Sequence, residues 1–66
     1  MEKHVILIGP HGERDYVEQI LTGGCPCTCG NNPEYALSFK EEDAEVWRKY
    51  FKKHWLYPHT DVVVEP

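Results

Sequence analysis

The sequence has no long apolar segment and no recognisable export signal. Among its 66 residues, no hydrophobic run reaches the roughly 20 residues that a membrane-spanning helix needs. The first residues, Met-Glu-Lys-His, lack the charged start and long apolar stretch of a signal peptide. We therefore expect a single cytoplasmic domain, residues 1–66, that makes no contact with a membrane.

Positive charge is also scarce. The chain has seven Lys and Arg residues against eleven Asp and Glu, a net charge of -4. General nucleic-acid binding needs a basic surface to displace counterions from phosphates, so we expect no direct contact with nucleic acid. Nine of the eleven acids lie in residues 1–45, whereas residues 46–59 contain four bases and no acid. The molecule is therefore dipolar.

Catalytic motifs are absent. Gly9-Pro10-His11-Gly12 follows an apolar run, but it lacks the Gly-Lys-Ser/Thr ending of a phosphate-binding loop and the glycine spacing of a dinucleotide loop. A plain turn is the better interpretation of this segment. No Ser, His and Asp arrangement points to nucleophilic catalysis, and we expect a protein that is not an enzyme.

Four segments have a readable secondary-structure pattern. Val5-Ile6-Leu7-Ile8 is apolar on both faces, as in a central buried strand. Residues 41–55 place Ala44, Trp47, Phe51 and Trp55 on one helical stripe, with acids in the first turn and bases in the last. Residues 61–65 (DVVVE) predict a final strand, and residues 34–39 (EYALSF) predict a strand that runs into the helix.

Residues 13–22 fit two interpretations. As a helix, Tyr16, Val17, Ile20 and Leu21 would form one face with Gly23 as its cap. We favour a strand, because β-branched and aromatic residues are frequent and the preceding turn is short. The prediction is an α+β fold: a small three- to four-stranded, mostly antiparallel sheet packed by one amphipathic helix, in the order β-β-β-α-β. The alternative is β-α-β-α-β.

The overall pattern HVILIG, DYVEQIL, EYALSFKEEDAEVWRKYF and DVVVE resembles small open reading frames of phages and mobile elements. The shared feature is an aromatic residue, here Phe39, followed five residues later by an alanine, here Ala44, in an acidic helix start. The resemblance implies a β-β-β-α-β fold. It implies no site residues, and the cysteines are not part of it.

All three cysteines lie in one short stretch, Cys25-Pro26-Cys27-Thr28-Cys29-Gly30. An odd number of thiols leaves one over in any disulfide scheme. If the sheet is a three-strand meander with its second turn near residues 24–32, the helix end with His54 returns to this loop, as do His59 and His4. Zinc favours such thiolate and imidazole ligands. We favour small, partly buried thiols in a Gly-rich turn, and the alternatives are a zinc site of Cys25, Cys27, Cys29 and His54 and a redox role.

The segment after the helix is rich in aromatic residues. Trp55, Tyr57 and His59 exceed what a short connector needs, and Trp and Tyr dominate protein interfaces. We expect a small acidic protein-binding module, an inhibitor or modulator of a host defence or nucleic-acid-processing protein, and we leave a homodimer open. The alternative function is a zinc-stabilised structural module.

Overall fold

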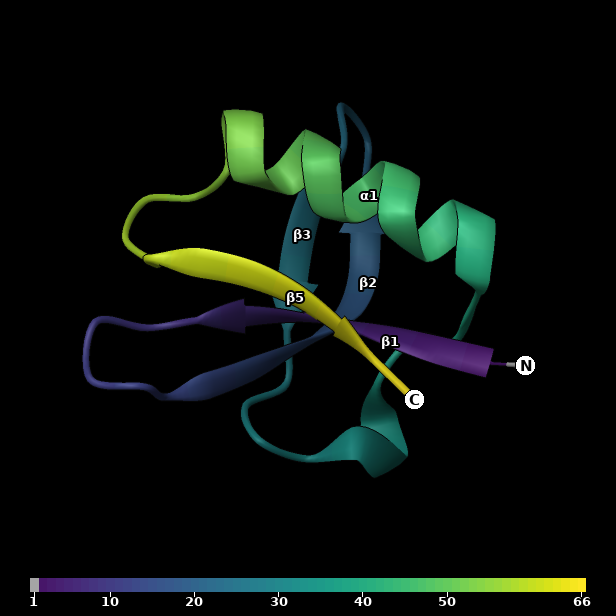
Figure 1. Cartoon of the computed structure of the whole chain (residues 1–66), viewed down its shortest axis with the longest axis horizontal. Helices are drawn as coiled ribbons and strands as arrows, with labels where there is room; N and C mark the ends of the chain where they lie inside the picture. Colours follow the sequence, from purple (N-terminus) through teal and green to yellow (C-terminus); the bar gives the residue numbers. More distant parts are fainter. Residues whose placement is uncertain (1) are drawn as a thin grey trace.

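The computed structural model describes residues 2–66 as one sheet crossed by a single helix (Figure 1). The elements in order are β1 (Glu2–Ile8), β2 (Arg14–Leu21), β3 (Cys25–Thr28), the 3-10 helix η1 (Pro33–Tyr35), β4 (Phe39–Lys40), α1 (Glu41–His54) and β5 (Asp61–Glu65). Five antiparallel strands and one α-helix form an α+β fold, so the predicted β-β-β-α-β layout is confirmed. The alternative is wrong because residues 14–21 form β2 rather than a helix.

Strand β1 lies in the middle of the sheet. Along one edge it pairs with β5 from His4 opposite Glu65 to Ile8 opposite Asp61. Along its other edge it pairs with β2 through residues 6–8 and with β4 through residues 2–3. Val5 and Ile6 are fully buried although strand alternation directs them to opposite faces, which explains the apolar run in the sequence.

The core lies between the sheet and α1. Its buried members are Val5, Leu7, Val17, Phe39, Ala44, Phe51 and Val62. The predicted helical stripe supplies Ala44 and Phe51, both fully buried, and Trp47 stacks on Phe51 with ring centroids 5.3 Å apart. Trp55, the last member of that stripe, follows the end of α1 and is 36% exposed.

A polar cluster lies on the sheet face opposite α1. Arg14 of β2 donates to both carboxylate oxygens of Glu65 in β5, with Nη1 3.0 Å from Oε2. It also donates to the Tyr16 hydroxyl at 3.1 Å, and the Tyr16 ring meets the His4 ring edge-on. These contacts join β2 to β5 across β1.

The sequence prediction was wrong for residues 34–39. Pro33–Tyr35 form η1, and only Phe39–Lys40 form a strand, β4. The Asn32 side chain accepts a hydrogen bond from the Glu34 amide at 3.2 Å, and Pro33 suits the first turn of a helix, so this segment starts a helical turn instead. The third strand is β3, the cysteine segment itself, and the second turn is residues 22–24 rather than 24–32.

Candidate functional site

The C-terminal half of α1 meets the hairpin that carries the cysteines. The β2–β3 hairpin rises behind α1 (Figure 1), and the Tyr50 hydroxyl donates to the Gly23 carbonyl at 3.0 Å. The hairpin turn needs the left-handed backbone that glycine adopts readily, with φ of 86° at Gly23 and 80° at Gly24. The helix therefore contacts the cysteine hairpin through Tyr50, but the topology argument was wrong about its course: α1 begins beside the start of β1, where Lys3 lies 3.6 Å from Glu41, and the connector after it reaches the first turn at Gly9.

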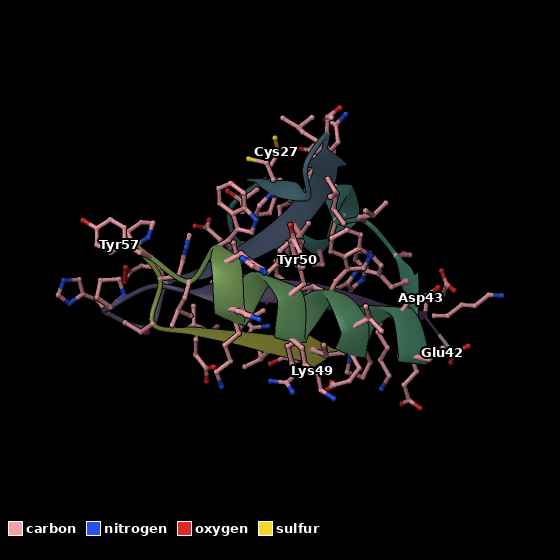
Figure 2. All side chains as sticks on the ribbon, turned by 90° about the horizontal axis from the view of Figure 1, so that it is seen from above. Cys27, Glu42, Asp43, Lys49, Tyr50 and Tyr57 are labelled. Atoms are coloured by element: carbon pink, nitrogen blue, oxygen red, sulfur yellow. The ribbon has the colours of Figure 1, made fainter. Side chains whose placement is uncertain are left out.

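Two of the cysteines share one face of β3. Cys25 lies opposite Leu21 and Cys27 opposite Gln19, while Pro26 lies opposite Ile20. Ile20 packs against the core, so alternation along the strand turns Cys25 and Cys27 away from it. Figure 2 shows Cys27 on the side of the hairpin that is turned away from α1.

The third cysteine has a different environment. The Cys29 thiol lies beyond the end of β3, 3.5 Å from the Asn32 carbonyl and 3.6 Å from the Tyr16 carbonyl. Burial raises the pKa of the Cys29 thiol, and the nearby carboxylates of Glu18 and Asp15 raise it further. Cys29 is therefore held in its neutral, hydrogen-bonded form.

The three histidines that were expected near the thiols contact other groups. The His54 ring lies over the Tyr50 ring at a centroid distance of 4.6 Å, and His4 Nδ1 lies 3.2 Å from the Leu37 carbonyl. His59 Nε2 lies 3.1 Å from Asp15 Oδ2. Within residues 2–66, no three His, Cys, Asp or Glu side chains are grouped so that they could hold a metal ion. A zinc site of Cys25, Cys27, Cys29 and His54 stays a prediction.

The connector between α1 and β5, residues 55–60, is fastened at both ends. The Trp55 amide donates to the Phe51 carbonyl at 2.7 Å, and the Thr60 amide donates to the Ile8 carbonyl at 2.7 Å. His59 adds its contact to Asp15, and its other ring nitrogen, Nδ1, is buried without a hydrogen-bond partner in the described chain. Between these anchors, Tyr57 is 92% exposed.

The charged residues are partly paired. Lys52 lies 3.3 Å from Asp61, Arg48 pairs with Glu45, and Lys3 lies 3.6 Å from Glu41. Other acids at the start of α1 are exposed, and Figure 2 shows Glu42 and Asp43 at the end of the molecule opposite to Tyr57. Glu42 and Asp43 therefore lie far from the connector that carries Tyr57.

Sequence reasoning missed two contacts that join distant positions. Arg14 and Glu65 are 51 residues apart, and Asp15 and His59 are 44 residues apart. Each contact depends on the register of β1 with its neighbours, which no local pattern encodes. The Gly23-Gly24 pair was a usable signal for the tight hairpin turn that places the cysteines in a strand.

The described residues form no enclosed pocket and contain no helix that is long and apolar enough to cross a membrane. No protein-family model matches the chain, and neither do any curated protein or any solved structure.

Proposed function

We propose that the protein is a non-enzymatic binding module that docks on another protein through the connector, with Tyr57 as its anchor. The observation that carries this proposal is the 92% exposure of Tyr57 in a segment fastened on both sides. A tyrosine offers a large contact area and has few rotatable bonds. Because the connector is already held in place, binding would cost little additional conformational entropy.

The surroundings of the connector favour a partner with a basic surface. Asp15 contacts His59 directly. The Thr60 hydroxyl donates a hydrogen bond to the Gly9 carbonyl at 3.3 Å, and exposed Glu13 lies in the same turn as Gly9. Two acidic groups therefore lie beside the C-terminal end of the connector. A groove that normally holds nucleic acid carries the complementary charge, and the net charge of -4 would speed association with it.

The kind of partner is inferred from the resemblance of the sequence to small open reading frames of phages and mobile elements. We propose a host protein of defence or nucleic-acid processing that this chain inhibits or modulates. Such a protein would act in the cytoplasm of the host cell. The proposal needs no catalytic residue and no cofactor.

The test is affinity capture from a bacterial lysate with three immobilised forms of the chain: the natural sequence, Tyr57→Ala and Tyr35→Ala. Tyr35 is a matched control because it is also exposed, at 62%, but lies on η1 away from the connector. An interface anchor typically contributes about 2 kcal/mol or more, so Tyr57→Ala should weaken a genuine partner about 30-fold. Tyr35→Ala should leave it unchanged.

A salt series on the captured partner then tests the charge argument. Affinity should fall as ionic strength rises, because complementary charge acts mainly on the association rate. If Tyr57→Ala and Tyr35→Ala capture the partner equally well, Tyr57 is not the anchor. Affinity that is independent of salt would refute the basic partner surface.

A further inference from the structure

Cys25 and Cys27 form a pair of thiols that the packing of the protein does not use. Both are half-buried and free of disulfides, and neither belongs to the hydrophobic core. Within residues 2–66, the one hydrogen bond of either thiol is a long one, 4.0 Å, from Cys25 Sγ to the Pro26 carbonyl. Strand β3 is the last strand on its side of the sheet, and the intermediate burial of Cys25 and Cys27 leaves part of each residue exposed to solvent.

The backbone sets the spacing of this pair. Alternate residues of a strand are about 6.6 Å apart along the chain, and their side chains lie on one face. Two sulfurs that share one metal ion in a linear arrangement are about 4.6 Å apart, twice a metal–sulfur bond of ~2.3 Å. Each thiol has to lean toward the other by about 1 Å, which side-chain rotation supplies. Pro26 restricts the backbone between them, so the spacing is fixed before any ion arrives.

The rest of the described chain offers this pair no further His, Cys, Asp or Glu ligand. Cys29 is held by the carbonyls of Asn32 and Tyr16, and no third His, Cys, Asp or Glu side chain in residues 2–66 completes a group with the pair. Structural zinc needs four protein ligands. A soft monovalent ion such as Cu⁺ prefers thiolates and accepts two of them.

We propose that Cys25 and Cys27 form a two-thiolate binding site for a soft monovalent cation, with Cu⁺ as its ligand. Binding forms two copper–sulfur bonds and releases one proton from each thiol, because the thiolate is the metal ligand. The oxidation state of the ion does not change. This site lies on the hairpin and is independent of the docking proposed for the connector.

The experiment titrates the reduced full-length chain with Cu⁺, without oxygen, in competition with a coloured Cu⁺ chelator. Native mass spectrometry gives the stoichiometry, and a weakly buffered titration counts released protons. We expect one ion per chain and two protons per ion. Cys25→Ser and Cys27→Ser should each weaken binding more than about 100-fold, since even residues outside the ligand shell change affinity by ~10–100-fold.

Cys29→Ser is the matched control, because it removes a thiol from the same segment but not from the pair. It should bind Cu⁺ within a factor of three or so of the natural chain, since its thiol is not a ligand. Circular dichroism confirms that each variant is folded. Equal losses for all three variants, one ion held between two chains, or equally tight binding of Zn²⁺ would each overturn the proposal. Absence of any Cu⁺ binding would do the same.

Discussion

The β2–β3 hairpin lies so close to α1 at Gly24 that a single methyl group there would collide with Tyr50. A Cβ atom at Gly24 would lie 2.7 Å from Cε1, 2.8 Å from the hydroxyl oxygen and 2.9 Å from Cζ of the Tyr50 ring. Contacts below 3.0 Å between such atoms do not persist, so the ring would have to move. Its hydrogen bond to the Gly23 carbonyl would then be lost.

The size of this effect follows from two separate costs. Alanine in the left-handed region costs about 1–2 kcal/mol, and this cost applies to Gly23 and Gly24 alike because φ is 86° and 80°. Displacing the Tyr50 ring adds about 1–3 kcal/mol of packing strain, including a hydrogen bond worth ~1 kcal/mol. We expect Gly24→Ala to lower the free energy of unfolding by about 2–5 kcal/mol, and Gly23→Ala by about 1–2 kcal/mol.

Gly23 provides the matched control because a Cβ there would have no atom within 4 Å. Urea unfolding followed by tryptophan fluorescence gives the free energy of unfolding for the natural chain and both variants. Thermal unfolding should agree, at about 4–8 °C per kcal/mol for a domain of this size. Total stability is expected to be roughly 3–10 kcal/mol for a chain of 66 residues, so the difference is easily measured.

A double-mutant cycle decides whether Tyr50 is the cause. In a Tyr50→Ala background the methyl group has space, so Gly24→Ala should cost no more than Gly23→Ala does. Equal losses for Gly23→Ala and Gly24→Ala in the natural background would refute the collision. An unchanged cost of Gly24→Ala after Tyr50 is removed would refute it as well.

Three further predictions concern the core, the polar cluster around Arg14 and the binding of a divalent metal ion. Phe51→Ala should lower the free energy of unfolding by about 3–5 kcal/mol in urea, because the fully buried ring leaves a cavity between α1 and the sheet; a loss below 1 kcal/mol would contradict the core assignment. Arg14 lowers the pKa of Glu65, so this pair contributes its full stabilisation above the ordinary glutamate pKa and loses it as the pH falls through the lowered pKa. Glu65→Gln should therefore be less stable than the natural chain at pH 7, with a difference that shrinks as the pH falls through that lowered value, and a difference that does not change with pH would count against the pair. A chelator of divalent ions should leave the thermal midpoint unchanged, because no described group of three ligands holds such an ion; a lowered midpoint would instead support the zinc-stabilised module.

Elements with a strong local pattern could be predicted from the sequence. The apolar run in β1, the amphipathic stripe of α1 and the valines of β5 each encode their own structure, and the observed bounds of α1 and β5 agree with the predicted ones within one residue. Residues 14–21 were correctly favoured as a strand, although their alternation is disturbed. The structure gives the reason, a register shift between Val17 and Gln19 that changes which residues face the core.

The remaining features depend on contacts that no window of sequence contains. The cysteine segment becomes a strand because β2 offers it a free edge, not because Cys-Pro-Cys-Thr favours extended structure. Most of residues 34–39 do not form the predicted strand, because Asn32 and Pro33 start the 3-10 helix η1 instead. The predicted gathering of the histidines at one end of the sheet was also wrong, because His59 lies beside Asp15 near the first turn whereas His4 lies toward the start of β1, opposite Glu65. The expected ligand set therefore rested on proximity alone.

The position of β1 sets a condition on how the chain folds during its synthesis. Strand β1 leaves the ribosome well before β5, the strand that it needs as its neighbour, since His4 pairs with Glu65. At about 5–20 residues per second the N-terminal valine and isoleucine side chains wait several seconds for β5, and non-local pairing is slow in itself. Newly made chains therefore expose an apolar strand until translation has passed residue 65. Chaperone demand should concentrate in that interval.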